Sequence, residues 1–251
     1  MPLRPIQIVP VPGLPEIAAG DDLAALIAGA LEEGELCVAG GDIFVVTQKI
    51  VSKAEGRIVQ LGSVLPSERA KRWALEYEKD PRLIELVLRE ARRIVRMERG
   101  LIIAETRQGF VCANAGVDTS NAPAETAILL PEDPDRSAEA LRQRLTASCA
   151  VEIGVIISDT FGRPWREGLV NVAIGVAGIA PLADYRATRD TSGRILQSTV
   201  LAVADELASA AELAMGKSEN VPVVIVKGYS SGAVRGTGRD LIRPAERDLF
   251  R

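Results

Sequence analysis

One of the most apolar runs in the sequence leads directly into a cluster of polar and charged residues. The run VEIGVII at 151–157 is followed closely by Asp159, Thr160, Arg163 and Arg166. Carboxylate and hydroxyl oxygens are ligands for hard divalent cations, and guanidinium groups bind phosphate. These residue types are typical either of a solvated turn or of a site that holds a metal ion and a phosphate group.

Two further polar clusters follow apolar runs in the same way. Gln48, Lys49 and Lys53 come after DIFVVT, and Asp118 and Asn121 come after GFVCANAG. Each cluster alone is typical of a solvated loop. Together they provide the one or two carboxylates that Mg²⁺ uses beside waters and substrate phosphates, and ammonium groups that neutralise phosphate. We interpret the clusters as a site for metal-assisted nucleotide or phosphate chemistry.

The composition restricts what this chemistry can be. The 251 residues contain no histidine, which excludes a Ser–His or Cys–His nucleophile pair and a His-ligated zinc ion. Cys37, Cys112 and Cys149 lack the paired spacing of a zinc site or a disulfide framework, so we expect buried free thiols. The formal net charge of −4 shows no basic excess, so no nucleic-acid partner is expected.

The sequence shows no sign of a membrane or secretory segment. No apolar stretch approaches the roughly 18 residues that span a bilayer. The N-terminal MPLRPIQIVPVPGLPEI is interrupted by prolines and lacks the apolar core of a signal peptide. We therefore expect a cytoplasmic protein without a membrane partner.

The elements that must position the clusters mix strands and helices without regular alternation. We expect a short strand in 6–17, a strand, a polar crossing and a second strand in 42–61, a hairpin in 101–116, and strands in 151–158, 170–182 and 221–229. We expect helices capped by Asp21 or Asp22, in 67–79, from Pro81 to about Met97, in 137–150 and in 198–216, and a helical tail. This pattern predicts an α+β fold. We expect one domain over 1–251, which could form two lobes.

The segment AELAMGKS resembles the end of a phosphate-binding P-loop at Gly216, Lys217 and Ser218. A P-loop needs a glycine five residues before Gly216, where this chain has Ala211, and it needs a preceding strand rather than a helix. We interpret the segment as a helix C-cap followed by a polar loop. RGTGRDL likewise lacks the third glycine of a dinucleotide-binding loop.

Over nearly its whole length the chain resembles the coenzyme F420-0:L-glutamate ligase family, the F420-0:gamma-glutamyl ligases. The specific segments are NAGVDTSN and SDTFGRPWREG, and IVSKAEGR, PSERAKRWA, VADELASAAELAMG and RDLIRPAERDLF follow the family's order and spacing. The resemblance implies a GTP-dependent ligase of coenzyme F420 biosynthesis. Such an enzyme adds L-glutamate to the lactyl carboxylate of F420-0, a deazaflavin phosphodiester, through an acyl phosphate, and can then extend a gamma-linked glutamate tail. It also implies two α+β subdomains that intertwine in a homodimer, without a Rossmann, P-loop or ATP-grasp module.

The same resemblance implies the residues of the site. Asp118, Asp159 and Thr160 would bind Mg²⁺ or Mn²⁺, and K⁺ is a further candidate cation. The residues that would contact GTP are Leu14, Pro15, Glu16, Ile17, Gln48, Lys49, Lys53, Asn121, Met215, Gly216, Lys217, Ser218, Glu219, Asn220, Val221 and Pro222. Arg163 or Arg166 would add positive charge for a phosphate. No residue is assigned as the base that takes the proton from the glutamate amine.

Lys217 departs from the family, because many members have Glu or Gln there as a further metal ligand. An ammonium group cannot ligate a metal unless it loses its proton. Lys217 therefore either leaves the second metal to other ligands, or neutralises phosphate in its place, or lies in solvent. Two other functions also fit the residues, a metal-dependent phosphohydrolase and a non-catalytic nucleotide- or deazaflavin-binding protein.

Overall fold

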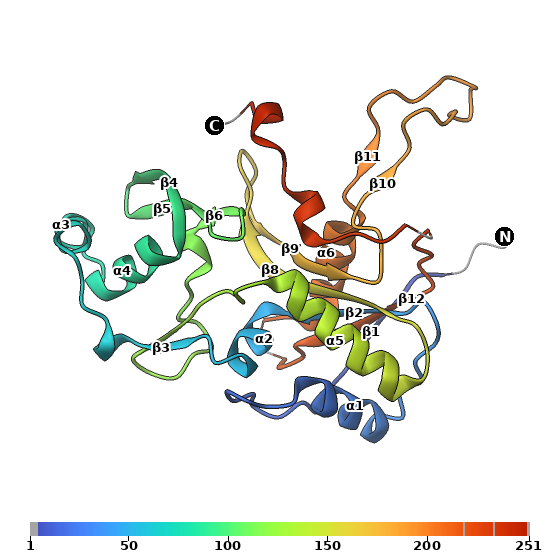
Figure 1. Cartoon of the computed structure of the whole chain (residues 1–251), viewed down its shortest axis with the longest axis horizontal. Helices are drawn as coiled ribbons and strands as arrows, with labels where there is room; N and C mark the ends of the chain where they lie inside the picture. Colours follow the sequence, from blue (N-terminus) through green and yellow to red (C-terminus); the bar gives the residue numbers. More distant parts are fainter. Residues whose placement is uncertain (1–4, 218, 233, 250–251) are drawn as a thin grey trace.

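A five-stranded sheet forms the centre of the molecule, with strand order β1-β12-β2-β8-β9 (Figure 1). The computed structural model describes residues 5–217, 219–232 and 234–249. Within these residues β2 and β8 pair in parallel, whereas the other neighbouring strands of the sheet are antiparallel. The prediction of an α+β fold rather than a Rossmann fold is confirmed. The strands are β1 (Gln7–Pro10), β2 (Ile43–Thr47), β8 (Gly154–Gly162), β9 (Leu169–Ala177) and β12 (Val223–Lys227).

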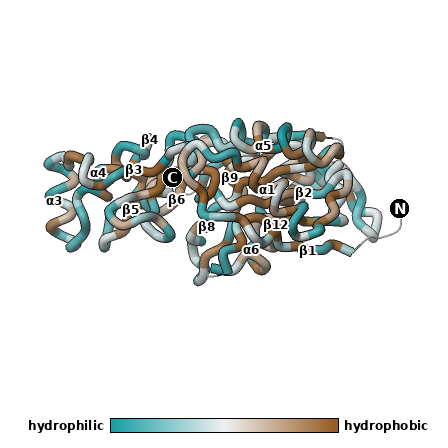
Figure 2. The backbone as a smooth tube through the Cα atoms, turned by 90° about the horizontal axis from the view of Figure 1, so that it is seen from below, coloured by the Kyte–Doolittle hydropathy of each residue, from teal (hydrophilic) through white to brown (hydrophobic). Residues whose placement is uncertain are grey.

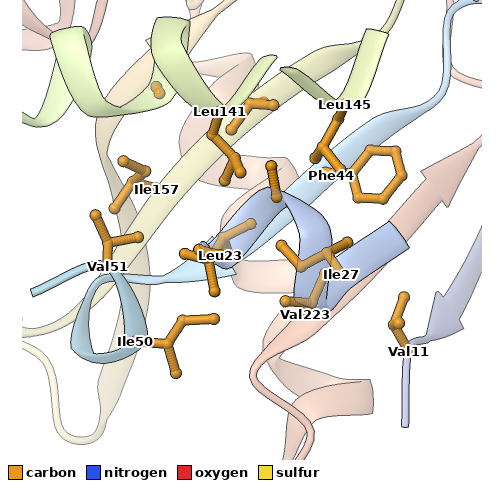
Figure 3. Close-up of a cluster of buried hydrophobic side chains, with 14 of the residues drawn as sticks. Val11, Leu23, Ile27, Phe44, Ile50, Val51, Leu141, Leu145, Ile157 and Val223 are labelled. Carbon is orange, nitrogen blue, oxygen red and sulfur yellow. The ribbon is translucent and has the colours of Figure 1, made fainter. Parts of the chain in front are cut away.

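Helices cover both faces of this sheet (Figure 1). In β2, Phe44 and Val46 pack into the core under α1 and α5, whereas Ile43 and Val45 pack into the core under α6. A strand that is buried on both faces carries a continuous apolar run, which explains why IFVV shows no polar alternation. Figure 2 shows the apolar residues concentrated between α5 and α6, and Figure 3 shows the cluster between the sheet, α1 and α5. The helices are α1 (Leu23–Glu33), α5 (Pro134–Cys149) and α6 (Val203–Met215).

A lobe extends from one end of the sheet (Figure 1). Its antiparallel sheet β4-β5-β6 shares a buried core with α3 and α4 that includes Ile84, Val87 and Ile102. Its elements are α3 (Glu68–Tyr77), α4 (Pro81–Glu90), β4 (Ala91–Glu98), β5 (Leu101–Thr106), β6 (Val111–Ala113) and the 3-10 turn η2 (Asn114–Gly116). The pair β3 (Ile58–Gln60) and β7 (Thr126–Ile128) connects the lobe to the sheet, with η1 (Leu61–Ser63) after β3.

An arm projects from the sheet between β10 (Ala183–Asp184) and β11 (Val200–Leu201), which pair at its base (Figure 1). The predicted helical tail forms only short 3-10 turns, η3 (Gly238–Leu241) and η4 (Ala245–Arg247). In the part of the chain that the structure describes, every helix is too short or too polar to cross a membrane.

Two predicted helix boundaries are confirmed. The Asp22 side chain accepts a hydrogen bond from the backbone N–H of Ala25 and so caps α1, as expected for an aspartate before an apolar-periodic segment. Gly216 ends α6 with a φ of 62°, a conformation that glycine adopts without strain. The interpretation of AELAMG as a helix and its cap, rather than a P-loop, is therefore correct.

Three other predictions are wrong. The residues after Thr47 form α2 (Gln48–Ala54) instead of a polar crossing, because Ile50 and Val51 pack into the core. The helix from Pro81 ends at Glu90, and the chain then forms β4 because pairing with β5 overrides the helix propensity of its Arg and Glu residues. The third error concerns β8, which does not end before Asp159 but continues to Gly162 in a hairpin with β9.

All three cysteines are free, as predicted, but their burial differs. Cys112 is buried, Cys149 is half-buried, and Cys37 is exposed, which corrects the expectation of buried thiols for Cys37. Burial and the nearby charge of Asp159 raise the pKa of Cys112 to about 12, so this thiol stays protonated.

Candidate functional site

A cavity of about 530 Å³ lies where the parallel strands β2 and β8 reach their paired carboxyl ends. The pairing of these strands ends at Thr47 and Ser158, and both residues line the cavity. Crevices at the carboxyl ends of parallel strands are frequent ligand sites in α/β proteins. The residues that line it come from separate parts of the chain, and besides those two they are Leu14, Pro15, Glu16, Ile17, Gln48, Lys49, Ile50, Lys53, Asn121, Asp159, Thr160, Asn171, Glu212, Met215, Gly216, Lys217, Asn220, Val221 and Pro222.

Three polar side chains of α2 line this cavity, those of Gln48, Lys49 and Lys53. Gln48 is buried, and its amide oxygen accepts a hydrogen bond from the Ser52 hydroxyl at 2.9 Å. The side chain of Lys53 is 8% exposed and forms an ion pair with Glu16, which is itself exposed on the cavity wall. A buried ammonium group needs such a partner because of its desolvation, and a bound anion would add a second one.

The carboxyl group of Asp159 lies in a poorly solvated environment between α2 and β6. Burial raises its pKa to about 6, and the negative charge of Asp118 acts in the same direction. The Thr160 backbone N–H, Lys49 and the Gln48 side chain lower the pKa of Asp159 by smaller amounts. Ionisation of a buried carboxyl group next to a second carboxylate is unfavourable, and a nearby cation offsets that cost. The pair of carboxylates therefore favours binding of a metal ion.

Asp118 connects this environment to the lobe. Its carboxylate forms an ion pair with Lys49 at 2.7 Å and accepts hydrogen bonds from the backbone N–H and the hydroxyl of Ser120. Burial opposes ionisation of Asp118, but the contacts with Lys49 and Ser120 lower its pKa overall. Asp118 is therefore ionised at neutral pH, and its charge is partly offset before any metal binds.

A strained turn places Asp118. Asn114, Ala115 and Gly116 have φ values of 52°, 51° and 72°, although the left-handed region is unfavourable for the first two. A Cβ on Gly116 would lie 2.5 Å from Cγ of the buried Leu130, so the turn requires glycine at this position. Strain of this kind concentrates at functional sites, where the surrounding structure maintains it.

A hydrogen-bonded network forms the α6 side of the cavity. The Thr160 hydroxyl donates to Asn171 Oδ1 at 2.7 Å, and Asn171 Nδ2 donates to Glu212 Oε2 at 2.7 Å. Lys217 forms an ion pair with Glu212 and donates a hydrogen bond to Thr160 Oγ1 at 3.1 Å. Alternation along β8 explains the geometry, since Thr160 faces α6 while Asp159 faces α2 and β6. Lys217 therefore lies where a cation would contact Thr160 and Glu212.

Comparison with known proteins gives the family of this chain. The family model described as F420-0:Gamma-glutamyl ligase matches residues 13–228. The chain is 49% identical over 249 residues to the coenzyme F420:L-glutamate ligase of Methanothermobacter thermautotrophicus, which covers 98% of this chain and 99% of that protein. It is 50% identical to the ligase of the same name from Methanopyrus kandleri, over 99% of both chains.

The chain belongs to the F420-0:gamma-glutamyl ligase family.

Most residues that the resemblance to this family implied come together in the cavity. Of the nucleotide residues, fourteen line it; Glu219 is not among the lining residues, and Ser218 lies outside the described residues. Asp159 and Thr160 also line it, and Asp118 reaches it through Lys49. Most of the predicted nucleotide residues and two of the three predicted metal ligands therefore line one cavity, whereas Asp118 lies beside it.

Arg163 and Arg166 are placed differently from the expectation. Both lie at the tip of the β8–β9 hairpin, outside the cavity lining, and Arg163 donates hydrogen bonds to the backbone oxygens of Glu167 and Gly168. The hairpin extends these side chains beyond the sheet, because β8 continues past the end of its pairing with β2. Their predicted role in neutralising phosphate within this cavity is not supported by their position.

Sequence reasoning assigned no role to Ser158, Asn171 and Glu212. A signal existed for Glu212, because the last turn of a helix disfavours negative charge and an acidic residue there needs another reason. Ser158 and Asn171 carried no comparable signal. Their roles depend on which face of the β8–β9 hairpin meets α6, and that is set by tertiary packing.

A hard divalent cation needs oxygen ligands, and the site offers two carboxylates. Among the described residues, no group of three or more His, Cys, Asp or Glu side chains is arranged to hold a metal ion. Mg²⁺ needs only one or two carboxylates when waters and substrate phosphates complete its shell. The carboxylate oxygens of Asp118 and Asp159 are close enough for the two charges to interact. These oxygens fit one Mg²⁺ or Mn²⁺.

Proposed function

We propose that this protein is a GTP-dependent ligase that joins L-glutamate to coenzyme F420-0 through an acyl phosphate and can then extend a gamma-linked tail. The observation that carries the proposal is the cavity at the ends of β2 and β8. There, in a member of the F420-0:gamma-glutamyl ligase family, Asp159 lines one cavity with Lys49, Lys53 and Lys217, and Asp118 adjoins that cavity through its ion pair with Lys49.

The reaction explains why the site has this composition. A carboxylate does not condense with an amine in neutral water, whereas transfer of the γ-phosphoryl group to the acceptor carboxylate gives an acyl phosphate that the glutamate amine attacks. Phosphoryl transfer depends mainly on positioning and charge neutralisation, so it needs no histidine. A divalent metal held by Asp118 and Asp159 would offset charge on the phosphate oxygens.

The lysines would neutralise the remaining negative charge of the phosphate groups. Lys49 lies beside Asp118, so its ammonium group is placed next to phosphate oxygens near the metal. Lys53, a buried residue of α2, pairs with Glu16 on the cavity wall, where it would orient the nucleotide. Lys217 is two-thirds exposed and can turn from Glu212 to a phosphate.

We also propose that two copies of the chain act as a homodimer. The arm between β10 and β11 carries the exposed apolar side chains Tyr185, Ile195, Val200 and Leu201. A second copy that covers these side chains would remove apolar area from water, which is the usual driving force for association.

Mass spectrometry of F420-0 incubated with GTP, Mg²⁺, L-glutamate and the purified protein tests the proposed activity. We expect the mass of F420-0 to increase by one or more glutamyl residues, with GTP consumed only when both F420-0 and glutamate are present. Consumption of GTP without glutamate would instead indicate a phosphohydrolase. Binding of GTP or F420-0 without turnover would indicate a non-catalytic protein.

Replacing Lys217 with alanine is expected to weaken GTP binding by about ten- to a hundredfold. A charge-assisted hydrogen bond contributes roughly 1.5–3 kcal/mol, and GTP should lose more affinity than GDP if Lys217 contacts the γ-phosphate. Lys217→Glu places a second carboxylate beside Glu212 and is expected to raise the dependence on Mg²⁺ or Mn²⁺. Calorimetric titration of both nucleotides at fixed Mg²⁺ measures these effects.

Lys71→Ala is the matched control for this prediction. Lys71 is an exposed lysine that pairs with Glu68 on α3, outside the cavity lining, so its loss should leave both affinities unchanged. Equal GTP affinities for the wild type and Lys217→Ala would show that Lys217 does not bind a phosphate of GTP.

A further inference from the structure

A second cavity, of about 260 Å³, lies in the lobe between α3, α4, β5 and η2. We call it the lobe cavity. Asp118 and Thr119 line it, whereas Lys49, the ion-pair partner of Asp118, and Asn121 line the first cavity. The segment 118–121 is therefore the wall that the two cavities share.

Part of the lining of the lobe cavity is apolar and includes an indole ring. Ile84, Val87 and Ile102 are at most 4% exposed, and Leu83 and Trp73 complete the apolar surface. The ring of Trp73 is fixed by a contact with Tyr77, with ring centroids 4.8 Å apart. Apolar side chains with convergent polar groups are the usual lining of small-molecule sites, and an indole ring can stack on a flat aromatic ligand. The polar residues that line it are Lys79, Asp80, Asn114, Asp118 and Thr119.

The charged residues that line the lobe cavity do not suit a free amino acid. Asp80 is already paired with Arg82 at 2.6 Å, and Asp118 is paired with Lys49. Lys79 is the single cationic side chain among the residues that line the lobe cavity. Glutamate carries two carboxylates, and their burial against an apolar wall would require more partners than Lys79 provides.

The geometry of the proposed reaction requires a separate place for a flat ring. In F420-0 the reacting carboxylate and the deazaflavin ring are at opposite ends of the molecule. If the carboxylate meets the γ-phosphate beside Lys49 and Asp159, the ring must lie outside the nucleotide cavity. The lobe cavity is adjacent across 118–121, on the side that carries Asp118 and Thr119.

We infer that the lobe cavity binds the deazaflavin ring of the acceptor, with the indole of Trp73 against the ring. This inference rests on the proposed function, because it names the site of the acceptor in that reaction. It assigns the lobe a direct part in substrate binding, in which α3 and α4 hold one end of the acceptor. The shared wall then directs the other end toward the nucleotide.

Tryptophan fluorescence provides a direct test, because the chain contains two tryptophans, Trp73 and Trp165. Trp165 is 81% exposed at the tip of the β8–β9 hairpin, and Trp165→Phe leaves Trp73 as the only tryptophan, which is excited selectively at a wavelength that tyrosine does not absorb. In that variant we expect saturable quenching of Trp73 by F420-0. The deazaflavin alcohol that lacks the phosphodiester and lactyl groups should quench it as well, because the ring alone would enter the lobe cavity.

Substitution of Trp73 provides the second measurement. Trp73→Ala in the wild-type chain should raise the KM for F420-0 about tenfold, the size expected from loss of one aromatic contact. The KM values for GTP and glutamate should stay within about twofold, and Trp73→Phe should restore most of the F420-0 affinity. The melting temperature and GTP affinity of each variant show whether the lobe and the nucleotide cavity are intact.

The results distinguish failure of the ring site from failure of the proposed function. If the wild type converts F420-0 but the ring does not quench Trp73, and Trp73→Ala keeps the normal KM, the ring binds elsewhere and the inference is wrong. A raised KM for glutamate with an unchanged KM for F420-0 would make the lobe cavity the amino-acid site instead. If the wild type neither binds nor converts F420-0, the proposed function fails, and the ring site fails with it.

Discussion

Turnover by the Asp159→Asn variant is expected to fall by about 100- to 1000-fold while the fold stays intact. The substitution removes one of the two carboxylates that fit the metal, and loss of one electrostatic contact to a developing charge has effects of this size. The amide keeps the shape and hydrogen-bonding capacity of the side chain. The loss should therefore appear in metal binding and catalysis rather than in folding.

The pKa of Asp159 gives this prediction a second readout. Because burial raises the folded-state pKa from 3.8 to about 6, the folded state binds a proton more tightly than the unfolded state in that interval. The contribution of Asp159 to stability therefore declines as the pH rises from about 4 to 6, and the ionised group is destabilising at neutral pH. Without metal at pH 7, Asp159→Asn should be at least as stable as the wild type.

Thermal unfolding with and without Mg²⁺, together with steady-state turnover, measures both effects. Asp205→Asn is the matched control, because burial also raises the pKa of Asp205 but its carboxylate accepts a hydrogen bond from Ala173 N outside the cavity lining. That control should change stability without changing metal affinity. A normal rate for Asp159→Asn at ordinary Mg²⁺ concentrations would remove Asp159 from the site.

Asp118→Asn is expected to lower turnover by about 100-fold and to weaken metal binding, since it removes the other carboxylate. It also leaves Lys49 without its counter-charge next to the metal position. In addition, the negative charge of Asp118 raises the pKa of Asp159, so that pKa should fall in the variant. Metal binding by the wild type should weaken below about pH 6, and in Asp118→Asn this decline should begin at lower pH.

Metal titrations across the pH range test the coupling between the two carboxylates. Asp42→Asn is the control, because Asp42 also pairs with a lysine, Lys227 at 2.9 Å, but is not among the residues that line the cavity. Asp42 lies just before β2, at the end of that strand opposite Thr47, so we expect the variant to lower stability and to leave the metal titration unchanged. If Asp118→Asn binds metal with the same affinity and pH dependence as the wild type, Asp118 is not a metal ligand and is not coupled to Asp159.

The sequence by itself determined the features that are encoded in short windows. Alternation, caps and apolar runs located most strands and helices, including the Asp22 cap and the end of α6 at Gly216, because these signals depend on neighbouring residues. The absence of histidine restricted the chemistry, and the specific motifs indicated the family. The same local rules failed where long-range pairing decided the outcome, as in β4.

The tertiary structure alone decided which polar clusters meet and what surrounds them. Lys49 contacts Ser120, 71 positions away, and Asn171 contacts Glu212, 41 positions away. No local pattern encodes such contacts, because they depend on how β8, α2 and α6 pack around the end of one parallel strand pair. The raised pKa of Asp159 and the lobe cavity have the same origin, since burial and proximity of charge are properties of the packed chain.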